Sequence, residues 1–131
     1  MTYLLDTDIC VGYLRGSDEQ VRDRLSSLAP TDTWLCSIVK AELIFGAYNS
    51  RRVAANLRRL HEFFQPLQSV GFDDRAAERY GPMRAHLRRE GSEIGPNDLM
   101  IAAIALANDM TLVTGNLREF HRVPGLMVAE W

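Results

Sequence analysis

The sequence predicts an α/β domain with a mostly parallel sheet. Short apolar runs of strand length alternate with longer segments of helical period along the chain. Such an alternation is typical of domains in which helices connect the strands of one sheet. The chain of 131 residues shows no internal repeat, low-complexity tract or interdomain linker. We therefore expect one domain, residues 1–131, with a core of its own.

The composition is that of an ordinary soluble globule, with 47% apolar and 24% charged residues. No apolar segment is long enough to span a bilayer, and Met1 to Tyr3 leads straight into a strand-like run, which argues against a signal peptide. We therefore expect a cytoplasmic protein without membrane contact. Cys10 and Cys36 match no metal-binding spacing, so both are expected to be small buried residues.

The first strand is followed by two helices. Residues 3–5 form a short apolar run that stops at Asp6, as a buried strand would. Asp8 can cap the helix after it, and a capping box of Ser17 and Gln20 starts the next one. The apolar positions of the two helices are Ile9, Cys10, Tyr13 and Leu14, followed by Val21, Leu25 and Leu28.

A loop over residues 30–33 leads to a second strand over residues 34–36 and then to a third helix. From Ile38 the apolar period becomes helical. The predicted inward residues of this helix are Ile38, Ala41, Phe45 and Tyr48. Glu42 lies on the same stripe, away from the polar face. An acid at that position is either paired with another group or placed to serve a site.

The rest of the chain continues the alternation. In order, we expect a helix from Arg51 to Phe64, a strand over 67–72, a helix capped by Asp73 or Asp74 that ends at Gly91, a helix from Pro96 to Ala107, a strand over 111–113 and a short strand over 125–128. The expected inward residues of the two earlier helices are Val53, Leu57, Leu60 and Phe64, then Ala77, Tyr80, Met83 and Leu87.

The stretch Gly95-Pro96-Asn97-Asp98 opens the most apolar of these helices. Proline suits the first helical position, and the nine residues from Leu99 to Ala107 carry no charge, which predicts a buried helix. The helix dipole favours an acid in the first turn, but an unpaired charge at the edge of a core is costly. Asp98 is therefore either a capping acid or a carboxylate that faces a cleft and shares a cation.

Several acids and an amide are expected near one rim of the sheet. Ligands of open α/β sheets bind beyond the carboxyl ends of the strands. Asp6 ends the first strand, Glu42 follows the second and Asn116 follows the fourth, whereas the fold must bring Asp98 to the same rim. Converging carboxylates repel one another unless they share a cation, and hard divalent ions prefer oxygen ligands. The pattern indicates a Mg²⁺ or Mn²⁺ site.

Four separated motifs resemble, in order, those of the PIN domain and in particular of the VapC toxins of bacterial toxin–antitoxin pairs. The motifs are Leu5-Asp6-Thr7-Asp8, Ser37-Ile38-Val39-Lys40-Ala41-Glu42-Leu43, Gly95-Pro96-Asn97-Asp98 and Leu112-Val113-Thr114-Gly115-Asn116. The likeness runs from Met1 to Trp131. It implies a PIN-like three-layer α/β/α domain with a mostly parallel central sheet of four or five short strands.

The resemblance also implies an activity and its partners. It points to a Mg²⁺- or Mn²⁺-dependent endoribonuclease toxin that hydrolyses RNA with metal-activated water. A VapB-like antitoxin is expected to inhibit it, and a homodimer and a hetero-oligomer with the antitoxin are the expected assemblies. Within that family a groove among the early helices accepts the antitoxin. The apolar residues expected beside such a groove are Val21, Leu25, Leu28, Val53, Leu57 and Leu60.

The site residues follow by position. Asp6, Glu42 and Asp98 correspond to the acidic metal ligands, and Asp6 or Asp98 would accept the proton of the attacking water. Asn116 stands where many PIN domains have a fourth acid, so we expect one firmly held ion. Asp8 and Glu119 are expected in supporting positions, and Thr7, Ser37 and Thr114 either bond ligands and phosphate or act as structural caps.

Arginine dominates the basic residues. Lys40 is the only lysine among the 15 lysines and arginines, and the net charge of −2 gives no general nucleic-acid signal. Arg84, Arg88 and Arg118 nevertheless stand out as candidates for local phosphate contacts.

Two other functions fit parts of the pattern. A non-cleaving PIN-like module that binds RNA or protein is the alternative that the missing fourth acid leaves open. A phospho-signalling receiver domain also gathers acids at strand ends, but it needs a lysine late in the chain, and the only lysine here is Lys40.

Overall fold

Five short strands form the central sheet of the computed structural model, which describes residues 1–131. They are β1 (Tyr3–Leu5), β2 (Thr33–Cys36), β3 (Gln68–Val70), β4 (Thr111–Val113) and β5 (Val128–Ala129). Their order is β3-β2-β1-β4-β5, and every neighbouring pair is parallel. The predicted α/β class is confirmed, with a sheet that is parallel throughout. Because β1 is central, the residue that follows it lies at the middle of one sheet edge.

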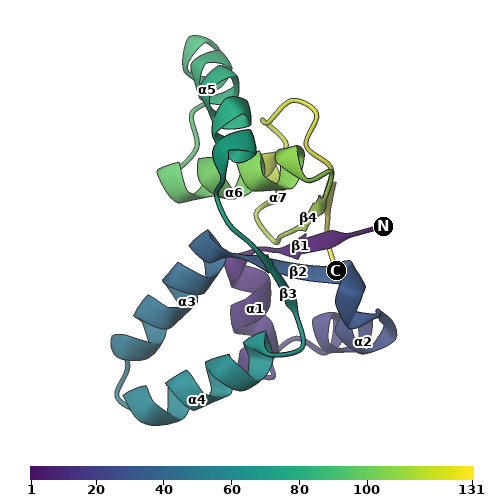
Figure 1. The fold of residues 1–131 in the computed structure, drawn as a ribbon, viewed down its shortest axis with the longest axis vertical. Helices are drawn as coiled ribbons and strands as arrows, with labels where there is room; N and C mark the ends of the chain where they lie inside the picture. The colour runs from purple at the N-terminus through teal and green to yellow at the C-terminus, as the bar shows by residue number, and fades with distance from the viewer.

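Helices cover both faces of this sheet. They are α1 (Thr7–Leu14), α2 (Glu19–Ser27), α3 (Ser37–Tyr48), α4 (Val53–Phe64), α5 (Asp74–Arg89), α6 (Pro96–Ala107) and α7 (Leu117–Phe120), with a 3₁₀ turn over Pro30–Asp32. Figure 1 shows α1 to α4 below the sheet and α5 to α7 above it. The three-layer arrangement expected from the resemblance is confirmed. None of these helices combines the length and the apolar character needed to cross a membrane.

The buried helix predicted after Gly95 is α6. Its residues from Ile101 to Ala105 have no exposed surface, and the helix packs against α5, α3 and β4. Pro96 stands at its first position, and Asn108 ends it, followed by Asp109 with a φ of 53°. A helix so enclosed cannot shift without disturbing the core, so its first turn is a rigid support.

Two of the predicted caps are wrong. The cap of α1 is Asp6, whose side chain accepts a hydrogen bond from the next amide, and not Asp8. Asp6 is the only residue between β1 and α1, so it occupies the N-cap position, and Asp8 already lies inside the helix. The cap of α2 is Asp18, which accepts from the amide three residues on, in place of the expected box of Ser17 and Gln20.

The predicted inward face of α3 is also wrong. The buried residues are Val39, Leu43 and Ala47, whereas Phe45 is 68% and Tyr48 64% exposed. Both sets recur at helical spacing, and α3 is apolar on nearly all sides, so periodicity does not distinguish the two faces. The exposed aromatic side chains are therefore left for contacts outside this chain.

The remaining differences concern element boundaries. The 3₁₀ turn replaces part of a predicted loop, and α4 starts at residue 53. Strand β3 is shorter than expected, β5 begins three residues later than expected, and α7 was not expected. In α5 the buried residue is Ala76 in place of Ala77. In α4, Leu60 and Phe63 are buried, whereas Phe64 lies partly exposed. Cys10 and Cys36 are free and buried, as predicted.

Candidate active site

One hollow at the carboxyl ends of the strands collects acids from distant parts of the chain. It measures about 460 Å³, and neither lysine nor arginine lines it. Asp6, Glu42 and Asp98 all line it together with Asn116, and Thr7, Asp8 and Val11 complete the wall. The structure thus brings the three acids singled out in the sequence to one place. We refer to this feature as the carboxylate hollow.

Each of the three acids stands at a fixed point of the fold. Asp6 links the central strand β1 to α1, and Asp98 lies in the first turn of the buried helix α6. Glu42 lies in the second turn of α3, which follows β2 directly. Because β1 pairs with both β2 and β4, the parallel sheet delivers these starting points to the same edge.

Asp6 is held on both of its carboxylate oxygens. Its Oδ1 accepts from the Thr7 amide at 2.8 Å, and its Oδ2 accepts from the Thr114 hydroxyl at 2.8 Å. Thr114 is fully buried after β4, and its Oγ1 also accepts from the amide of Asn116 at 2.9 Å. This chain of bonds joins the beginning and the end of the sequence and fixes the orientation of a carboxylate that is only 6% exposed.

Glu42 and Asn116 are also oriented by neighbours. The Thr7 hydroxyl donates to Glu42 Oε1 at 2.8 Å and so ties α1 to α3. The Asn116 side-chain amide donates to Glu119 Oε2 at 2.7 Å, within the first turn of α7. Thr7, Thr114 and Glu119, three of the residues given supporting roles from the sequence, therefore contact site residues directly.

Asp8 lies in the first turn of α1 and reaches across to the loop after β4. Its Oδ2 accepts from the Gly115 amide at 2.9 Å, and a Cβ added at residue 115 would lie 2.8 Å from that same oxygen. Glycine therefore allows the loop to approach the carboxylate closely. A backbone amide has no sequence signature, so this contact could not be found from the pattern of residue types.

Gly115→Ala is expected to destabilise the protein by about 1 kcal/mol, because the new methyl group displaces the Asp8 carboxylate from the amide. Urea unfolding would measure the loss. Asp8→Ala removes the same bond without a clash, so the double variant should cost less than the sum of the two single variants. Additive losses would show that the effect of Gly115→Ala does not arise at Asp8.

Two carboxylates of the hollow, those of Asp6 and Asp98, have raised pKa values. Burial raises the pKa of Asp6 to about 6, helped by the charges of Asp8 and Glu42 and opposed by its hydrogen bonds. Burial also raises the pKa of Asp98 to about 7, reinforced by the charge of Asp6 and by the hydrogen bond and charge of Glu119. Negative charge at this place is thus held at a cost in free energy.

The donor set suits a hard cation, although the side chains do not enclose one as they stand. The two salt bridges of the protein involve other acids, so Asp6, Glu42 and Asp98 have no cationic partner. At the same time, no three acidic, histidine or cysteine side chains lie close enough together to coordinate one ion. Side-chain rotation is needed before the carboxylate oxygens could converge on an ion.

The other residues predicted for the site lie outside the hollow. Ser37 is exposed at the first position of α3 and makes no hydrogen bond through its side chain. Arg84 and Arg88 belong to α5, and Arg118 is exposed on α7.

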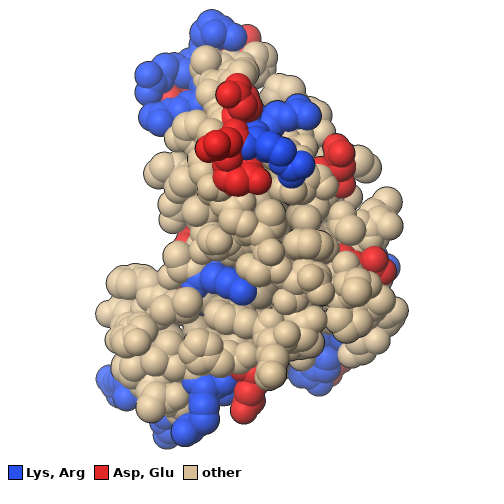
Figure 2. Space-filling model, viewed as in Figure 1, with Lys and Arg blue, Asp and Glu red and all other residues tan.

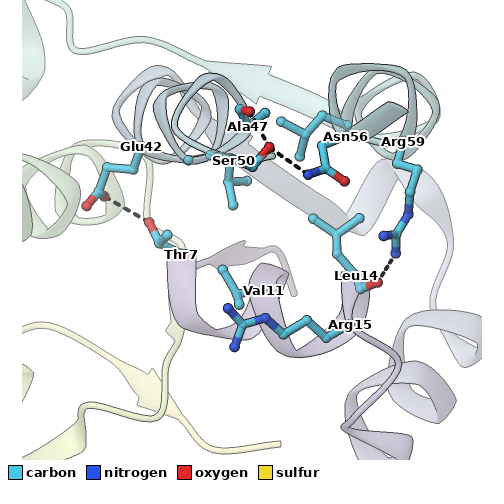
Figure 3. Close-up of a pocket in the computed structure, with 12 residues that line it drawn as sticks. Thr7, Val11, Leu14, Arg15, Glu42, Ala47, Ser50, Asn56 and Arg59 are labelled. Carbon is cyan, nitrogen blue, oxygen red and sulfur yellow. Dashed lines mark hydrogen bonds between the residues drawn. The ribbon is translucent and has the colours of Figure 1, made fainter. Parts of the chain in front are cut away.

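A second hollow of about 290 Å³ lies between α1, α3 and α4 (Figure 3). It begins at Thr7 and Glu42, which also line the carboxylate hollow, and it extends to Arg15 and Arg59 at its other end. Its wall is partly apolar, through Val11, Leu14, Leu43, Ala47 and Leu60. We refer to it as the helical groove. Glu42 is thus shared by the helical groove and the carboxylate hollow.

Most of the apolar residues expected beside the antitoxin groove do not line the helical groove. Among the six named from the sequence, Leu60 alone lines it. Val21 is fully buried, and Leu25 and Leu28 line a separate depression beside α2. The reason is that α1, and not α2, packs opposite α3 and α4 across the groove.

The family model of the PIN domain matches residues 3–126 of this chain. Among similar proteins, the ribonuclease VapC2 of Rickettsia felis is 38% identical over 132 residues, covering 100% of this chain and 98% of that protein. A tRNA(fMet)-specific endonuclease VapC of Salmonella typhimurium is 36% identical over 131 residues, with the same coverage.

Solved structures show the same likeness. The chain superposes on VapBC2 from Rickettsia felis, solved bound to a DNA fragment from its promoter, with a TM-score of 0.94 and 37% identity. That match covers 100% of this chain and 99% of the other. For DNA-bound VapBC from Salmonella typhimurium the TM-score is 0.95 at 35% identity, covering 100% of this chain and 98% of the other.

Proposed function

Since the chain belongs to the PIN-domain family, as a VapC toxin ribonuclease of a VapBC toxin–antitoxin system, we propose that it is a Mg²⁺- or Mn²⁺-dependent endoribonuclease. In this proposal residues 1–131 are a single PIN domain, and the carboxylate hollow is its active site. The observation that carries the proposal is that three carboxylates from separate elements line one hollow without any cationic side chain among them.

The residues that would hold the ion are Asp6, Glu42 and Asp98, with the side-chain oxygen of Asn116 beside them. Their oxygens are ligands that Mg²⁺ and Mn²⁺ prefer. The pKa values of Asp6 and Asp98 are raised first by burial and then by the charges of neighbouring acids, and a cation would offset both effects. When bound, such an ion supplies a Lewis acid that activates water and stabilises the leaving oxygen.

The protein's own groups would position and deprotonate the attacking water. Asp6 or Asp98 accepts the proton of the water that attacks phosphorus in line with the leaving ribose oxygen. Thr114 and Thr7 orient the Asp6 and Glu42 carboxylates through their hydroxyl groups before the ion binds. Asp98 is supported by the buried helix α6, so the backbone keeps the three acids at one edge of the sheet while their side chains rotate towards the ion.

The proposal is tested by incubating purified protein with total RNA and with a tRNA(fMet) transcript, in Mg²⁺, Mn²⁺ or EDTA. The transcript is included because two relatives, 36% and 35% identical, are named tRNA(fMet)-specific endonucleases. We expect discrete RNA fragments with either ion and none in EDTA. Binding of RNA without fragments under any condition would favour the alternative, a non-cleaving PIN-like module.

Asn116→Asp is expected to tighten Mn²⁺ binding about tenfold, because a carboxylate adds charge beside the proposed ion. The same change replaces the amide that donates to Glu119 Oε2 and sets two acids against each other, so the ion-free variant should also melt at a lower temperature. Isothermal calorimetry measures the affinity. Unchanged affinity would contradict the position assigned to residue 116.

The proposed protein partner is a VapB-like antitoxin. Two of the similar structures, from Rickettsia felis and Salmonella typhimurium, are VapBC complexes, and we assign the antitoxin to the helical groove. A segment lying there would reach Glu42 and obstruct the carboxylate hollow (Figure 3). A homodimer and a hetero-oligomer with the antitoxin belong to the same proposal, and the exposed Phe45 and Tyr48 offer apolar surface for such contacts.

A further inference from the structure

The last turns of α5 carry a hollow bordered by arginines. Arg84, Arg88 and Arg89 surround it, and the small residues Gly81 and Ala85 form its floor. It measures about 390 Å³, and no acidic residue lines it. In Figure 2, lysine and arginine atoms gather at the outer end of α5, at the top of the view. We refer to the three arginines as the α5 arginine cluster.

Contacts within the protein account for little of this cluster. Arg88 pairs with Glu93 at 3.0 Å, but both side chains are more than half exposed, and surface pairs of this kind add little stability. Arg89 makes no ion pair or side-chain hydrogen bond. The helix dipole favours basic residues in the last turn, yet Arg84 lies farther back, where that effect has faded. Arg84 and Arg88, four residues apart, repel each other.

The arginines are oriented by groups that leave most of their donors free. One terminal nitrogen of Arg84 donates to the Tyr80 hydroxyl at 3.0 Å, and its guanidinium lies 5.9 Å from the centre of the Tyr80 ring. Arg88 uses Nε towards Glu93. A guanidinium carries five N–H donors in a planar fork that matches phosphate oxygens, so each arginine can still bind an anion.

The floor of the hollow lets a ligand approach the helix backbone. A Cβ added at Gly81 would meet no atom within 4 Å, so no packing constraint keeps the position small. Gly81 and Ala85 lie between Arg84 and Arg88 on one side and Arg89 on the other, which makes a shallow cradle with positive walls.

The cluster is connected to the carboxylate hollow by a short, anchored loop. Asp98 lies nine positions after Arg89, so their Cα atoms are at most about 30 Å apart. Glu93 in this loop is held by Arg88, and its carbonyl accepts from Arg122 at 3.2 Å. In addition, α5 packs along α6, the helix that carries Asp98. An anion on the cluster would thus lie at a defined place relative to the proposed active site.

We propose that the α5 arginine cluster binds the phosphate backbone of the RNA substrate and directs the strand towards the carboxylate hollow. This inference rests on the proposed ribonuclease function. Backbone contacts of this kind fix the position of a nucleic acid without reading its sequence. They also explain how a protein of net charge −2 holds a polyanion, because three of its arginines are grouped around one hollow.

The test measures RNA binding in EDTA, where cleavage does not interfere. The probe is a fluorescein-labelled tRNA(fMet) transcript, and fluorescence anisotropy is recorded at several salt concentrations. The triple variant Arg84→Gln/Arg88→Gln/Arg89→Gln should raise Kd at least tenfold and reduce the slope of log K against log[salt] by about 2. The matched control, Arg51→Gln/Arg52→Gln/Arg58→Gln, removes the same charge near α4, at the opposite end of the molecule (Figure 1).

We expect the control to keep its Kd within twofold and its salt slope unchanged. Equal losses in both triple variants would overturn the proposal, since they would reflect total charge. Arg89→Gln alone breaks no contact within the protein and should still raise Kd about threefold; thermal melting confirms that each variant is folded. Binding of poly-glutamate is measured in the same way. If the triple variant at α5 loses affinity for poly-glutamate but keeps its affinity for RNA, the cluster is assigned to an acidic protein segment and the proposal is overturned.

Cleavage assays separate this inference from the function on which it rests. With Mn²⁺ the triple variant at α5 should show a raised KM and an unchanged kcat. A parent protein that binds tRNA through the cluster but never cleaves it would refute the nuclease proposal and leave the surface assignment standing. If the parent cleaves tRNA and the triple substitution leaves KM unchanged, the surface assignment is refuted and the nuclease proposal stands.

Discussion

Replacing Asp6 by asparagine is expected to lower RNA cleavage about a thousandfold while the fold stays intact. The change removes one negative charge from the carboxylate hollow, where the proposed ion needs it. The amide oxygen of asparagine can still accept from the Thr7 amide, and the Thr114 hydroxyl can accept from the new NH₂ group. Initial rates on a tRNA(fMet) transcript in Mn²⁺ measure the effect.

The matched control is Asp23→Asn, the same chemical change at an exposed position of α2. It should leave the rate unaltered. In EDTA the Asp6→Asn protein should melt at the same temperature as the parent or higher, because burial makes the ionised Asp6 carboxylate unfavourable. Asp98→Asn should behave alike, and cleavage within tenfold of the parent by either variant would contradict the assigned site.

The ion-free protein is expected to lose stability as the pH rises from about 4 to about 7. The pKa of Asp6 is raised from 3.8 to about 6 and that of Asp98 to about 7, so the folded state binds more protons than the unfolded state in this window. The protonated carboxyls are favourable in the hollow, and their advantage is lost as each group ionises. For Asp6 the loss is about 3 kcal/mol.

Urea unfolding in EDTA at several pH values between 4 and 8 measures this dependence. Above pH 7 the curve should level, and Mn²⁺ should restore stability there because it binds the ionised carboxylates. The double variant Asp6→Asn/Asp98→Asn lacks both titrating groups, so its profile should be flatter than that of the parent. Superposable profiles would show that the two acids do not govern the dependence.

Most strands and helices could be predicted from the sequence because their residues carry local signals. The run of residues 3–5 ends at a strand-breaking acid, and proline at position 96 marks a helix start that the structure reproduces. Boundaries such as those of β3 were harder to predict, since strand length there depends on pairing with β2 and not on the run of apolar residues.

The inward face of α3 needed information that is absent from the sequence. Val39 and Phe45 are both apolar and both fit a helical stripe, yet one is fully buried and the other largely exposed. The choice is made by the rotation of the helix against the sheet and α1, which is a tertiary property. The position of Leu25, outside the helical groove, has the same cause.

The members of the site were predictable in different degrees. Asp6 directly follows β1 and Glu42 lies in the helix that follows β2, so the general rule for parallel sheets indicates their rim, whereas Asp98 required the family likeness. The contact between Asp8 and the Gly115 amide could not be predicted, because it joins residues 107 positions apart through a backbone group. The hollow that Arg89 and Gly81 line together on the surface of α5 likewise becomes visible only in the structure.

The hydrogen bond from Thr114 to Asp6 spans 108 positions, nearly the whole polypeptide. A chain still emerging from the ribosome has Asp6 exposed long before Asp98 and Thr114 are made, and β1 then lacks its neighbour β4. The proposed site therefore cannot assemble until synthesis of the chain is almost complete.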